Sequence, residues 1–600
     1  MLFGTARLSS SIDTSVDPCD DFYQFACGGW IEKHPVPEGA SHVDQFQLLK
    51  DQSKNKIREI LEADNSDLKG NPLMQARSLY RSCLDEDKIE KKGVEPILEV
   101  LRSLGLPQVP TLKKQETFSW QGALVNAEKM LGDSIFFSLD VIQHPLDSSK
   151  HVLQVQKGSI EKVPETKCQG DRDTVEAFIA DYINMFIKHV PGVTVDAKRM
   201  ATEIYAFHSE LGNMTTDAGH YLEMTASELQ EITDSHISTN STNRFNWSVY
   251  FNQVLDGDEN TSLKRKEKDG RIIVRDQQYF ERWSRLFQSS SPEMIEMYIW
   301  WRVFSSLAPY TTREFQMRQQ KFWQKVGGTR IITPRWKVCL EMVNKAYGYI
   351  VNFEYAKIHL DKDLREQALW LVSEIKEFVK GYEKELNWMD SETKKQGLKK
   401  IESLRANVVN HDEPLFPSKL EQFYSLINFV DGDLFELHLK ILSALEASKL
   451  NSLYLTPKKE PALVYDSDQS KANVHYDPET NSISIPVSLL QPPMHDLRNS
   501  RVEFAAISPL ISFEITRVFN IGHVKRFKEV PICNENHYES NTTIASKLQD
   551  EEIQMWCSNT SPTSVNDLLT GRSMVLGTLS KTNEFRRAWG CPMGSKMNPW

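Results

Sequence analysis

The sequence predicts a mainly α-helical protein with a small β component. Through much of the first 450 residues, apolar side chains recur at spacings of three and four, which is typical of helices that bury one face. After residue 458 one stretch alternates between apolar and polar residues, as a β-strand does. The composition is that of a folded, water-soluble protein, because 40% of the 600 residues are hydrophobic and 26% are charged. This length corresponds to roughly four domain-sized units.

Four segments carry the helical pattern most clearly. The segment 388–408 offers Asp390 or Ser391 as its N-cap, and its apolar residues then follow at spacings of three and four. The segment 302–326 is amphipathic and rich in aromatic residues. We interpret the apolar stripes as the packing faces of a helical core. The four helical segments, in chain order, are 45–64, 74–84, 302–326 and 388–408.

The β component lies mainly in residues 472–490. A turn at residues 477–481 is followed by alternation at Ile483, Ile485 and Val487, which predicts a hairpin-like segment. The sequence Gln-Pro-Pro ends this segment, and residues 504–518 resume as an apolar helix. Residues 143–162 have a mixed pattern that is also compatible with strands.

Charge and apolar content exclude several classes of function. The chain has 71 Lys and Arg against 82 Asp and Glu, which gives a formal net charge of −11. An acidic chain without a long basic patch is not expected to bind nucleic acid. No stretch approaches the ~20 apolar residues of a membrane-spanning helix, so we expect no membrane anchor within this chain. The first residues also lack the apolar core of a secretory signal.

Six N-glycosylation sequons point to a different compartment. Read literally, a chain without a signal or an anchor is cytosolic, whereas glycosylation acceptors belong to secreted proteins. A targeting segment missing from this chain would reconcile the two readings, and we therefore expect an extracellular or cell-surface protein. The sequons begin at Asn213, Asn240, Asn246, Asn260, Asn541 and Asn559.

The cysteines and histidines exclude several common metal and redox motifs. No two of the eight cysteines form a C-x-x-C pair, which disfavours zinc ribbons and thioredoxin-like sites. The 15 histidines never approach more closely in sequence than His144 and His151 do. The chain therefore contains no H-E-x-x-H and no histidine pair four residues apart on one helix face.

A series of spaced motifs resembles one protein family. The motifs are D-P-C-D-D-F-Y-Q-F-A-C-G-G-W at 17–30, Y-R-S-C at 80–83, W-M-D-S-E-T-K-K at 388–395, L-L-Q-P-P at 489–493, W-C at 556–557, C-P at 591–592 and M-N-P-W at 597–600. In this order they resemble the neprilysin and endothelin-converting-enzyme family of zinc metalloendopeptidases. The resemblance covers nearly the whole chain.

The resemblance implies a two-lobed ectodomain that is secreted or is part of a type II membrane protein. Residues 16–457 would form a mostly helical N-terminal lobe, and residues 458–600 a shortened, thermolysin-like C-terminal lobe. The family pattern also implies three disulfides, which join Cys19 to Cys591, Cys27 to Cys557 and Cys83 to Cys339. Cys168 and Cys533 are left without their usual partners, so a bond between them, a free thiol and an intermolecular bond are all open.

The family's zinc-binding helix is altered in this chain. Zinc hydrolysis of this kind needs two histidines at i and i+4 and a glutamate beside the first, which is the general base for the zinc-bound water. Here Phe513 and Arg517 occupy the two ligand positions, and neither a phenyl ring nor a guanidinium binds Zn²⁺. Glu514 remains at the place of the general base. Without a metal beside it, we interpret Glu514 as a relic that pairs with Arg517 at i+3.

Other positions that the family uses are altered as well. No motif for the third zinc ligand lies between Cys533 and Cys557, and the family's transition-state histidine has no counterpart near residues 565–567. The substrate-binding arginine aligns near Met574, and Arg572 replaces it only after a slip of two residues. Asn473 keeps the position of a substrate-binding asparagine, although an ordinary strand residue is an equally good interpretation. The remaining histidines of this lobe, which show no ligand spacing, are His475, His495, His523 and His537.

The sequence therefore predicts a pseudopeptidase that keeps the fold, needs no zinc or other cofactor, and binds peptides or protein partners. We also expect Arg517 to take the place of the lost cation beside Glu514, because an unpaired buried carboxylate is costly. Two alternatives are open. One is an active zinc metalloendopeptidase that cuts small peptides through an unrecognised metal site. The other is a shortened isoform, or a faulty gene model, of an active relative.

Overall fold

The structure is a computed structural model in which most of the chain is described. The described residues are 9–37, 42–63, 72–110, 119–145, 147–158, 169–214, 221–238, 241–255, 270–327, 332–383, 390–408, 424, 433–454, 472–478, 480–492, 494, 500–517, 558–560, 587–596 and 598. The residues named above that lie outside this set are Cys168, Cys533, Cys557, Asn240, Asn260, Asn541, His495, His523, His537, Arg572 and Met574.

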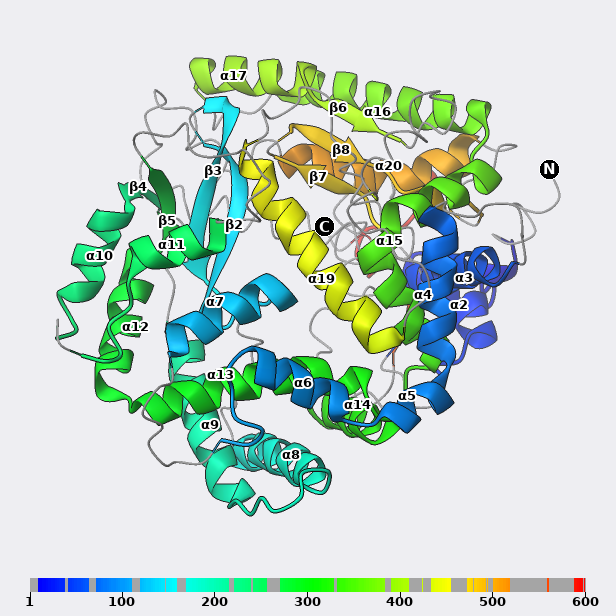
Figure 1. Ribbon diagram of the computed structural model, residues 1–600. Coiled ribbons are helices and arrows are strands. Elements are labelled where there is room, and N and C mark those ends of the chain that lie inside the picture. The colour runs from blue at the N-terminus through cyan, green and yellow to red at the C-terminus, as the bar shows by residue number, and fades with distance from the viewer. Residues whose placement is uncertain are drawn as a thin grey trace.

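Helices dominate the described structure, which confirms the predicted fold class (Figure 1). No described helix combines the length and the apolar character needed to cross a membrane. The helices are α2 (Phe22–Lys33), α3 (Gln45–Glu62), α4 (Pro72–Leu84), α5 (Glu86–Lys92), α6 (Glu95–Ser103), α7 (Trp120–Leu131), α8 (Gln169–Ile187), α9 (Ala197–Asn213), α10 (Ala226–Asp234), α11 (Trp247–Leu255), α12 (Gln277–Ser289), α13 (Pro292–Leu307), α14 (Arg313–Gly327), α15 (Arg335–His359), α16 (Lys362–Glu383), α17 (Ser391–Glu402), α19 (Leu434–Asn451) and α20 (Ser500–Thr516). Short 3₁₀ turns are η1 (Ala308–Tyr310), η3 (Ser452–Tyr454) and η4 (Val487–Leu490).

The strands form three small groups. The largest sheet has the order β2-β3-β5-β4, in which β3 and β5 run parallel and the other neighbours antiparallel. A three-stranded sheet has the order β6-β8-β7, so that β7 is an edge strand. The strands are β1 (His42–Asp44), β2 (Phe137–His144), β3 (Asp147–Lys157), β4 (Tyr221–Thr225), β5 (Arg271–Arg275), β6 (Arg405–Asn407), β7 (His475–Asp477), β8 (Ser482–Ser484) and β9 (Ser558–Thr560), the last paired with β1.

The predicted elements exist, but one helix ends earlier than expected and another segment is broken in two. Asp390 caps α17 as predicted, because its carboxylate accepts hydrogen bonds from the N–H groups of Glu392 and Thr393. The helix predicted over 388–408 nevertheless ends at Glu402, because residues 405–407 pair with β8 as strand β6. The predicted segment 302–326 is also not one helix. It is broken between α13 and α14 at η1, where Pro309 supplies no backbone N–H.

The predicted hairpin is confirmed, although it is shorter than its apolar alternation. Strands β7 and β8 pair antiparallel, with Tyr476 opposite Ile483. Asn481 precedes β8 with a positive φ of 47°, a conformation that asparagine tolerates better than most residues. The alternation continues to Val487, but strand β8 ends at Ser484 and the chain turns into η4.

The buried apolar residues form two hydrophobic cores. The first takes most of its residues from positions 94–326 and is rich in aromatic side chains. The second combines residues 49–83 with residues 339–515, so the start of the chain packs with its later part. The predicted lobe boundary between residues 457 and 458 stays a prediction, since much of 458–600 lies outside the described residues.

Helix α19 links these two cores. Phe435 and Leu442 belong to the first core, whereas Leu434, Leu437 and Ile441 belong to the second. Apolar residues on several faces are expected of a helix that is enclosed by neighbours on more than one side. Figure 1 shows α19 crossing the middle of the molecule between α7 on one side and α15 on the other.

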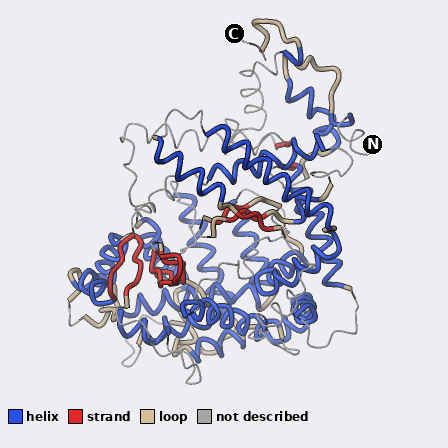
Figure 2. Tube along the Cα trace, turned by 90° about the horizontal axis from the view of Figure 1, so that it is seen from above, coloured by secondary structure: helices blue, strands red, loops and turns tan. Residues whose placement is uncertain are grey.

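Two of the predicted disulfides are present and a fifth cysteine, Cys27, is also bonded. Cys83 of α4 is joined to Cys339 of α15, and Cys19 is joined to Cys591 near the other end of the chain. Figure 2 shows the described C-terminal segment beside the N-terminal helix. Cys27 is also disulfide-bonded, but its predicted partner Cys557 lies outside the described residues, so that pairing stays a prediction.

Candidate functional site

Helix α20 (Ser500–Thr516) carries the segment in which the sequence predicts an altered zinc-binding helix. Its apolar face, with Ile507, Ile511 and Ile515 fully buried, packs into the second core. Glu514 lies on the same turn and is also buried, with 4% of its surface exposed. Edge strand β7 lies against this helix. The packing of α20 therefore carries an ionisable group into the protein interior, where it needs polar partners.

Both carboxylate oxygens of Glu514 are engaged. The backbone N–H of Tyr476, in β7, donates to Oε2 at 2.7 Å. The guanidinium of Arg517 donates through Nη1 to Oε1 at 3.1 Å and to Oε2 at 3.2 Å. The Arg517 side chain is 46% exposed, so the cation of this pair is partly open to solvent while the carboxylate is buried. The predicted pairing of Arg517 with Glu514 is confirmed.

The donor set on this helix does not fit a zinc ion. A zinc site needs nitrogen, sulfur or oxygen ligands with free lone pairs, and the Phe513 ring has none. The Arg517 guanidinium is a permanent cation that repels a metal ion and already occupies the Glu514 carboxylate. Within the described ranges, no group of three or more His, Cys, Asp or Glu side chains is arranged to hold a metal ion.

Asn473 is exposed two residues before the edge strand β7. Its side chain is exposed, as is that of His475, while Val474 and Tyr476 between them are buried. This alternation places Asn473 and His475 on the outer side of the strand and the buried pair on the inner side. An exposed asparagine next to a sheet edge is compatible with the predicted contact to a peptide backbone.

The predicted glycosylation sites that are described have different surroundings. Asn213 is exposed at the end of α9, and Asn559 lies in β9 opposite Val43. Asn246 is half-buried and caps α11, because its Oδ1 accepts the N–H of Val249 at 3.0 Å. Asn240, Asn260 and Asn541 lie outside the described residues.

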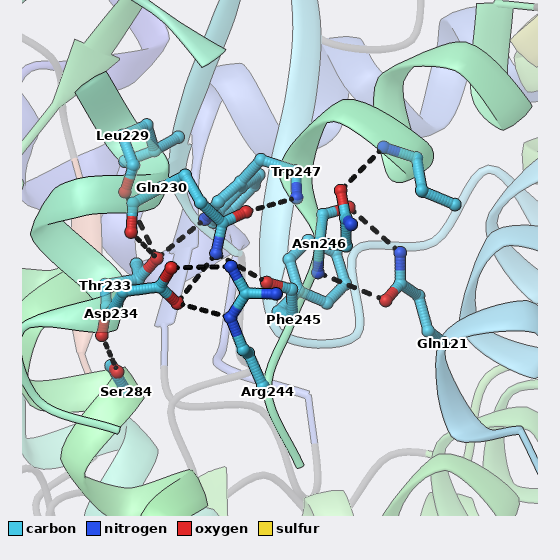
Figure 3. A network of polar contacts seen from close by, with 11 residues as sticks. Gln121, Leu229, Gln230, Thr233, Asp234, Arg244, Phe245, Asn246, Trp247 and Ser284 are labelled. Atoms are coloured by element: carbon cyan, nitrogen blue, oxygen red, sulfur yellow. Dashed lines mark hydrogen bonds and ion pairs between the residues drawn. The ribbon is translucent and has the colours of Figure 1, made fainter. Parts of the chain in front are cut away.

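The segment around Asn246 is held by a polar network (Figure 3). The backbone of Asn246 exchanges two hydrogen bonds with the side chain of Gln121, at 3.0 and 3.2 Å. Arg244 forms a bidentate pair with Asp234 at 2.9 and 2.6 Å. Burial acts to raise the pKa of Asp234, but the hydrogen bonds from Arg244 and Gln230 outweigh it and lower the pKa below its usual range. This network fixes the loop before α11 against α10.

The structure also buries two ionisable groups that the sequence analysis did not single out. Glu128 of α7 is enclosed at the contact with α19, and its Oε2 accepts the hydroxyl of Tyr250 at 2.7 Å. Burial raises the pKa of Glu128 to about 8. His438 of α19 lies against the ring of Tyr310, and burial lowers its pKa to about 3. The only signal in the sequence was that both residues lie among apolar residues within a helical segment.

Comparisons with known proteins agree with one another. The model for the family described as Peptidase family M13 matches residues 18–410. Endothelin-converting enzyme 1 of Rattus norvegicus is 24% identical over 99% of this chain and 86% of that protein. The structure of Mycobacterium tuberculosis zinc metalloprotease ZMP1 in complex with an inhibitor matches with a TM-score of 0.76 at 16% identity, covering 98% of this chain and 97% of that one. PepO from Lactobacillus rhamnosis matches with a TM-score of 0.74 at 14% identity, covering 98% of both chains. The structural matches confirm the fold.

Proposed function

The chain belongs to peptidase family M13, and from that premise we propose that it is a member without zinc-dependent hydrolysis that binds a peptide or protein ligand. The observation that carries this proposal is the state of Glu514. A general base needs a free lone pair next to the water that it activates. Here one oxygen accepts the Tyr476 N–H and both accept from Arg517, so the carboxylate serves a structural ion pair.

The substitution at position 517 supports the same conclusion through charge. In a zinc site, the ion supplies the positive charge that lowers the pKa of bound water. In this chain the cation beside Glu514 is a guanidinium, which compensates the carboxylate but activates no water. Arg517 therefore replaces the electrostatic role of a metal without its chemistry.

The edge of the small sheet supports a binding role. An edge strand offers backbone groups to which an extended peptide can add. Asn473 is exposed two residues before β7, the edge strand that also contacts α20. We expect a bound peptide to contact this edge and the Asn473 amide. An Asn473→Ala variant should then bind more weakly, while an exposed residue of a distant helix, such as Arg199 of α9, should be neutral when changed to alanine.

The alternative is an active zinc metalloendopeptidase. The comparisons favour this alternative, since one relative is named a converting enzyme and one solved neighbour is a zinc metalloprotease. It requires metal ligands other than those on α20. A shortened isoform or a faulty gene model of an active relative is the third reading, and transcript mapping across residues 520–557 tests it.

Metal analysis combined with peptide cleavage separates the two main readings. The purified chain is analysed for zinc by mass spectrometry and incubated with a pool of short, unstructured peptides, with and without a chelator. We expect zinc well below one ion per chain and no cleavage. Stoichiometric zinc, together with chelator-sensitive cleavage that a Glu514→Gln variant loses, would overturn the proposal. Cleavage that Glu514→Gln retains would identify a contaminating protease or a different site.

We also propose that the protein acts outside the cell or at its surface. Two disulfides, one of them joining residues 572 positions apart in sequence, support this location because such bonds persist in oxidising compartments. If the chain is expressed with a secretion signal, removal of N-linked glycans should lower its mass. An unchanged mass would count against the use of the sequons.

A further inference from the structure

A cavity of about 440 Å³ lies among the helices of the first core, apart from α20 and β7. Helices α8, α9, α13 and α14 form most of its wall, and α15 and α19 contribute Lys345, His438 and Leu442. Neither α20 nor β7 supplies a lining residue. This volume is in the range of pockets that enclose small organic molecules.

Aromatic rings make one side of the cavity. Phe178 and Phe322 stack with their centroids 4.2 Å apart, and Trp301 meets Phe178 edge-on at 6.4 Å. Rings fixed in such a cluster present flat apolar surfaces on which a further aromatic ring can stack or meet an edge. This wall therefore favours a planar, apolar body in the ligand.

His438 provides a polar group inside the same cavity. Its surface is only 5% exposed, and its ring packs against Tyr310 with centroids 3.9 Å apart and the ring planes tilted by 32°. Among the described residues, none forms a hydrogen bond with its ring nitrogens. Because burial, and secondarily the charge of Lys345, lower its pKa to about 3, the imidazole is neutral at pH 7. A neutral imidazole has one N–H donor and one acceptor nitrogen, so the side chain can donate a hydrogen bond to a polar group of a ligand in the cavity.

The charges around the cavity indicate the sign of the ligand. Arg302 is compensated by Asp133, with Nη2 and Oδ2 3.2 Å apart, and it also donates to the carbonyl of Ser134. Lys345 is exposed and lines the cavity, and it forms no ion pair with the residues that the structure describes. The lining therefore has an excess of positive charge, which disfavours a cationic ligand and favours an anionic one.

We propose that this cavity binds a small aromatic carboxylate, whose ring packs against Phe178 and Trp301 and whose carboxylate accepts a hydrogen bond from His438. Lys345 adds attraction at the rim. This site is independent of the proposed function of α20, because it shares no residue with Glu514, Arg517 or Tyr476. Binding here can therefore succeed or fail whatever the zinc content of the protein.

The test uses 2-naphthoate as the probe, titrated into the full chain and followed by calorimetry and by tryptophan fluorescence. We expect a Kd of about 1 mM or lower, as for a fragment-sized ligand in a preformed pocket. A His438→Phe variant keeps the ring but loses the hydrogen bond, and it should bind about ten-fold more weakly. The cation 2-naphthylmethylamine should bind the parent chain no more tightly than 2-naphthoate binds the His438→Phe variant.

A matched control is available at another buried histidine. His359 of α15 also has its pKa lowered by burial, to about 4, and lies 4.6 Å from the ring of Tyr355, but it does not line the cavity. A His359→Phe variant should bind 2-naphthoate as the parent does. If His438→Phe fails to fold, Lys345→Gln replaces it and should weaken binding several-fold at low salt, with less effect at high salt. No binding by the parent chain, or equal binding by His438→Phe and the parent, would overturn the proposal.

Discussion

The ion pair between Arg517 and Glu514 makes the most direct prediction. An Arg517→Ala variant leaves the Glu514 carboxylate buried, and among the described residues the Tyr476 N–H is then its remaining hydrogen-bond donor. Because the carboxylate is almost inaccessible to water, it cannot regain by hydration what it loses in the ion pair. We therefore expect the variant to be less stable than the parent around α20 and β7.

The free-energy cost of breaking the ion pair depends on how deeply each of its two side chains is buried. Breaking a fully buried pair costs about 3–5 kcal/mol, and an exposed pair contributes about 0.2–1 kcal/mol. The Glu514 side chain is buried, with 6% of its surface exposed, whereas the Arg517 side chain is 46% exposed. An intermediate cost of about 2 kcal/mol is expected, equivalent to roughly thirty-fold in a local opening equilibrium.

Hydrogen exchange read by mass spectrometry is the suitable assay, because a protein with two cores is not expected to unfold in one step. Peptides that cover residues 474–478 and 507–516 should exchange about thirty-fold faster in Arg517→Ala. The matched control is Arg199→Ala, which removes an exposed i,i+4 pair with Glu203 and should change local opening by less than about two-fold.

A double-mutant cycle separates the ion pair from other losses. Glu514→Gln keeps an acceptor for the Tyr476 N–H but removes the charge, so Arg517→Ala should cost little in that background. Exchange in Arg517→Ala that is no faster than in the parent would refute the ion-pair reasoning. Equal costs of Arg517→Ala with and without the Glu514 charge would show that packing, not charge, is responsible.

Three further predictions concern stability. The parent should lose stability between about pH 5 and pH 8, because the folded Glu128 carboxyl, with its pKa raised to about 8, stays protonated while the unfolded one ionises. Glu128→Gln should remove this loss, which amounts to up to about 5 kcal/mol. Melting temperatures that fall equally with pH in both proteins would contradict this. Replacing Cys83 and Cys339 by alanine opens a crosslink across 256 residues and should lower the melting temperature, at a cost of up to about 5 kcal/mol; an unchanged melting temperature would refute it. Arg244→Ala should cost about 1 kcal/mol at pH 7. This cost should vanish as pH falls below the lowered pKa of Asp234, so a cost that persists in acid would exclude the ion pair as its source.

The helices were predictable where their signals are local. Asp390 is an N-cap residue that predicts the start of α17, and the apolar spacing in residues 45–64 predicts α3, which spans Gln45–Glu62. Capping and helical periodicity depend on residues within one or two turns, so they can be read from a short window. The disulfides of Cys19 and Cys83 came instead from resemblance to a family, since cysteine positions alone do not fix their pairing.

Where helices end was harder to predict, because distant strands compete for the same residues. The apolar spacing in 388–408 continues past Glu402, yet residues 405–407 leave the helix to pair with β8, about 75 positions later in the chain. Periodicity reports which side chains become buried, and Leu404 and Val408 are indeed buried. It does not report whether a helix or a strand buries them.

Some features of the candidate site were likewise readable from the sequence, whereas others depend on the tertiary structure. The sequence by itself determined that Phe513 precedes Glu514 and that a cation, Arg517, stands three residues after it. That these two residues stand at the positions of zinc ligands came from resemblance to a family and stays a prediction. Only the tertiary structure decided that Glu514 is buried, that the N–H of Tyr476 reaches it from 38 positions away, and that His438 opens into a cavity. The reason is physical: residue identity and helical spacing are properties of the chain, whereas burial and long-range hydrogen bonds exist only when separate segments are packed together.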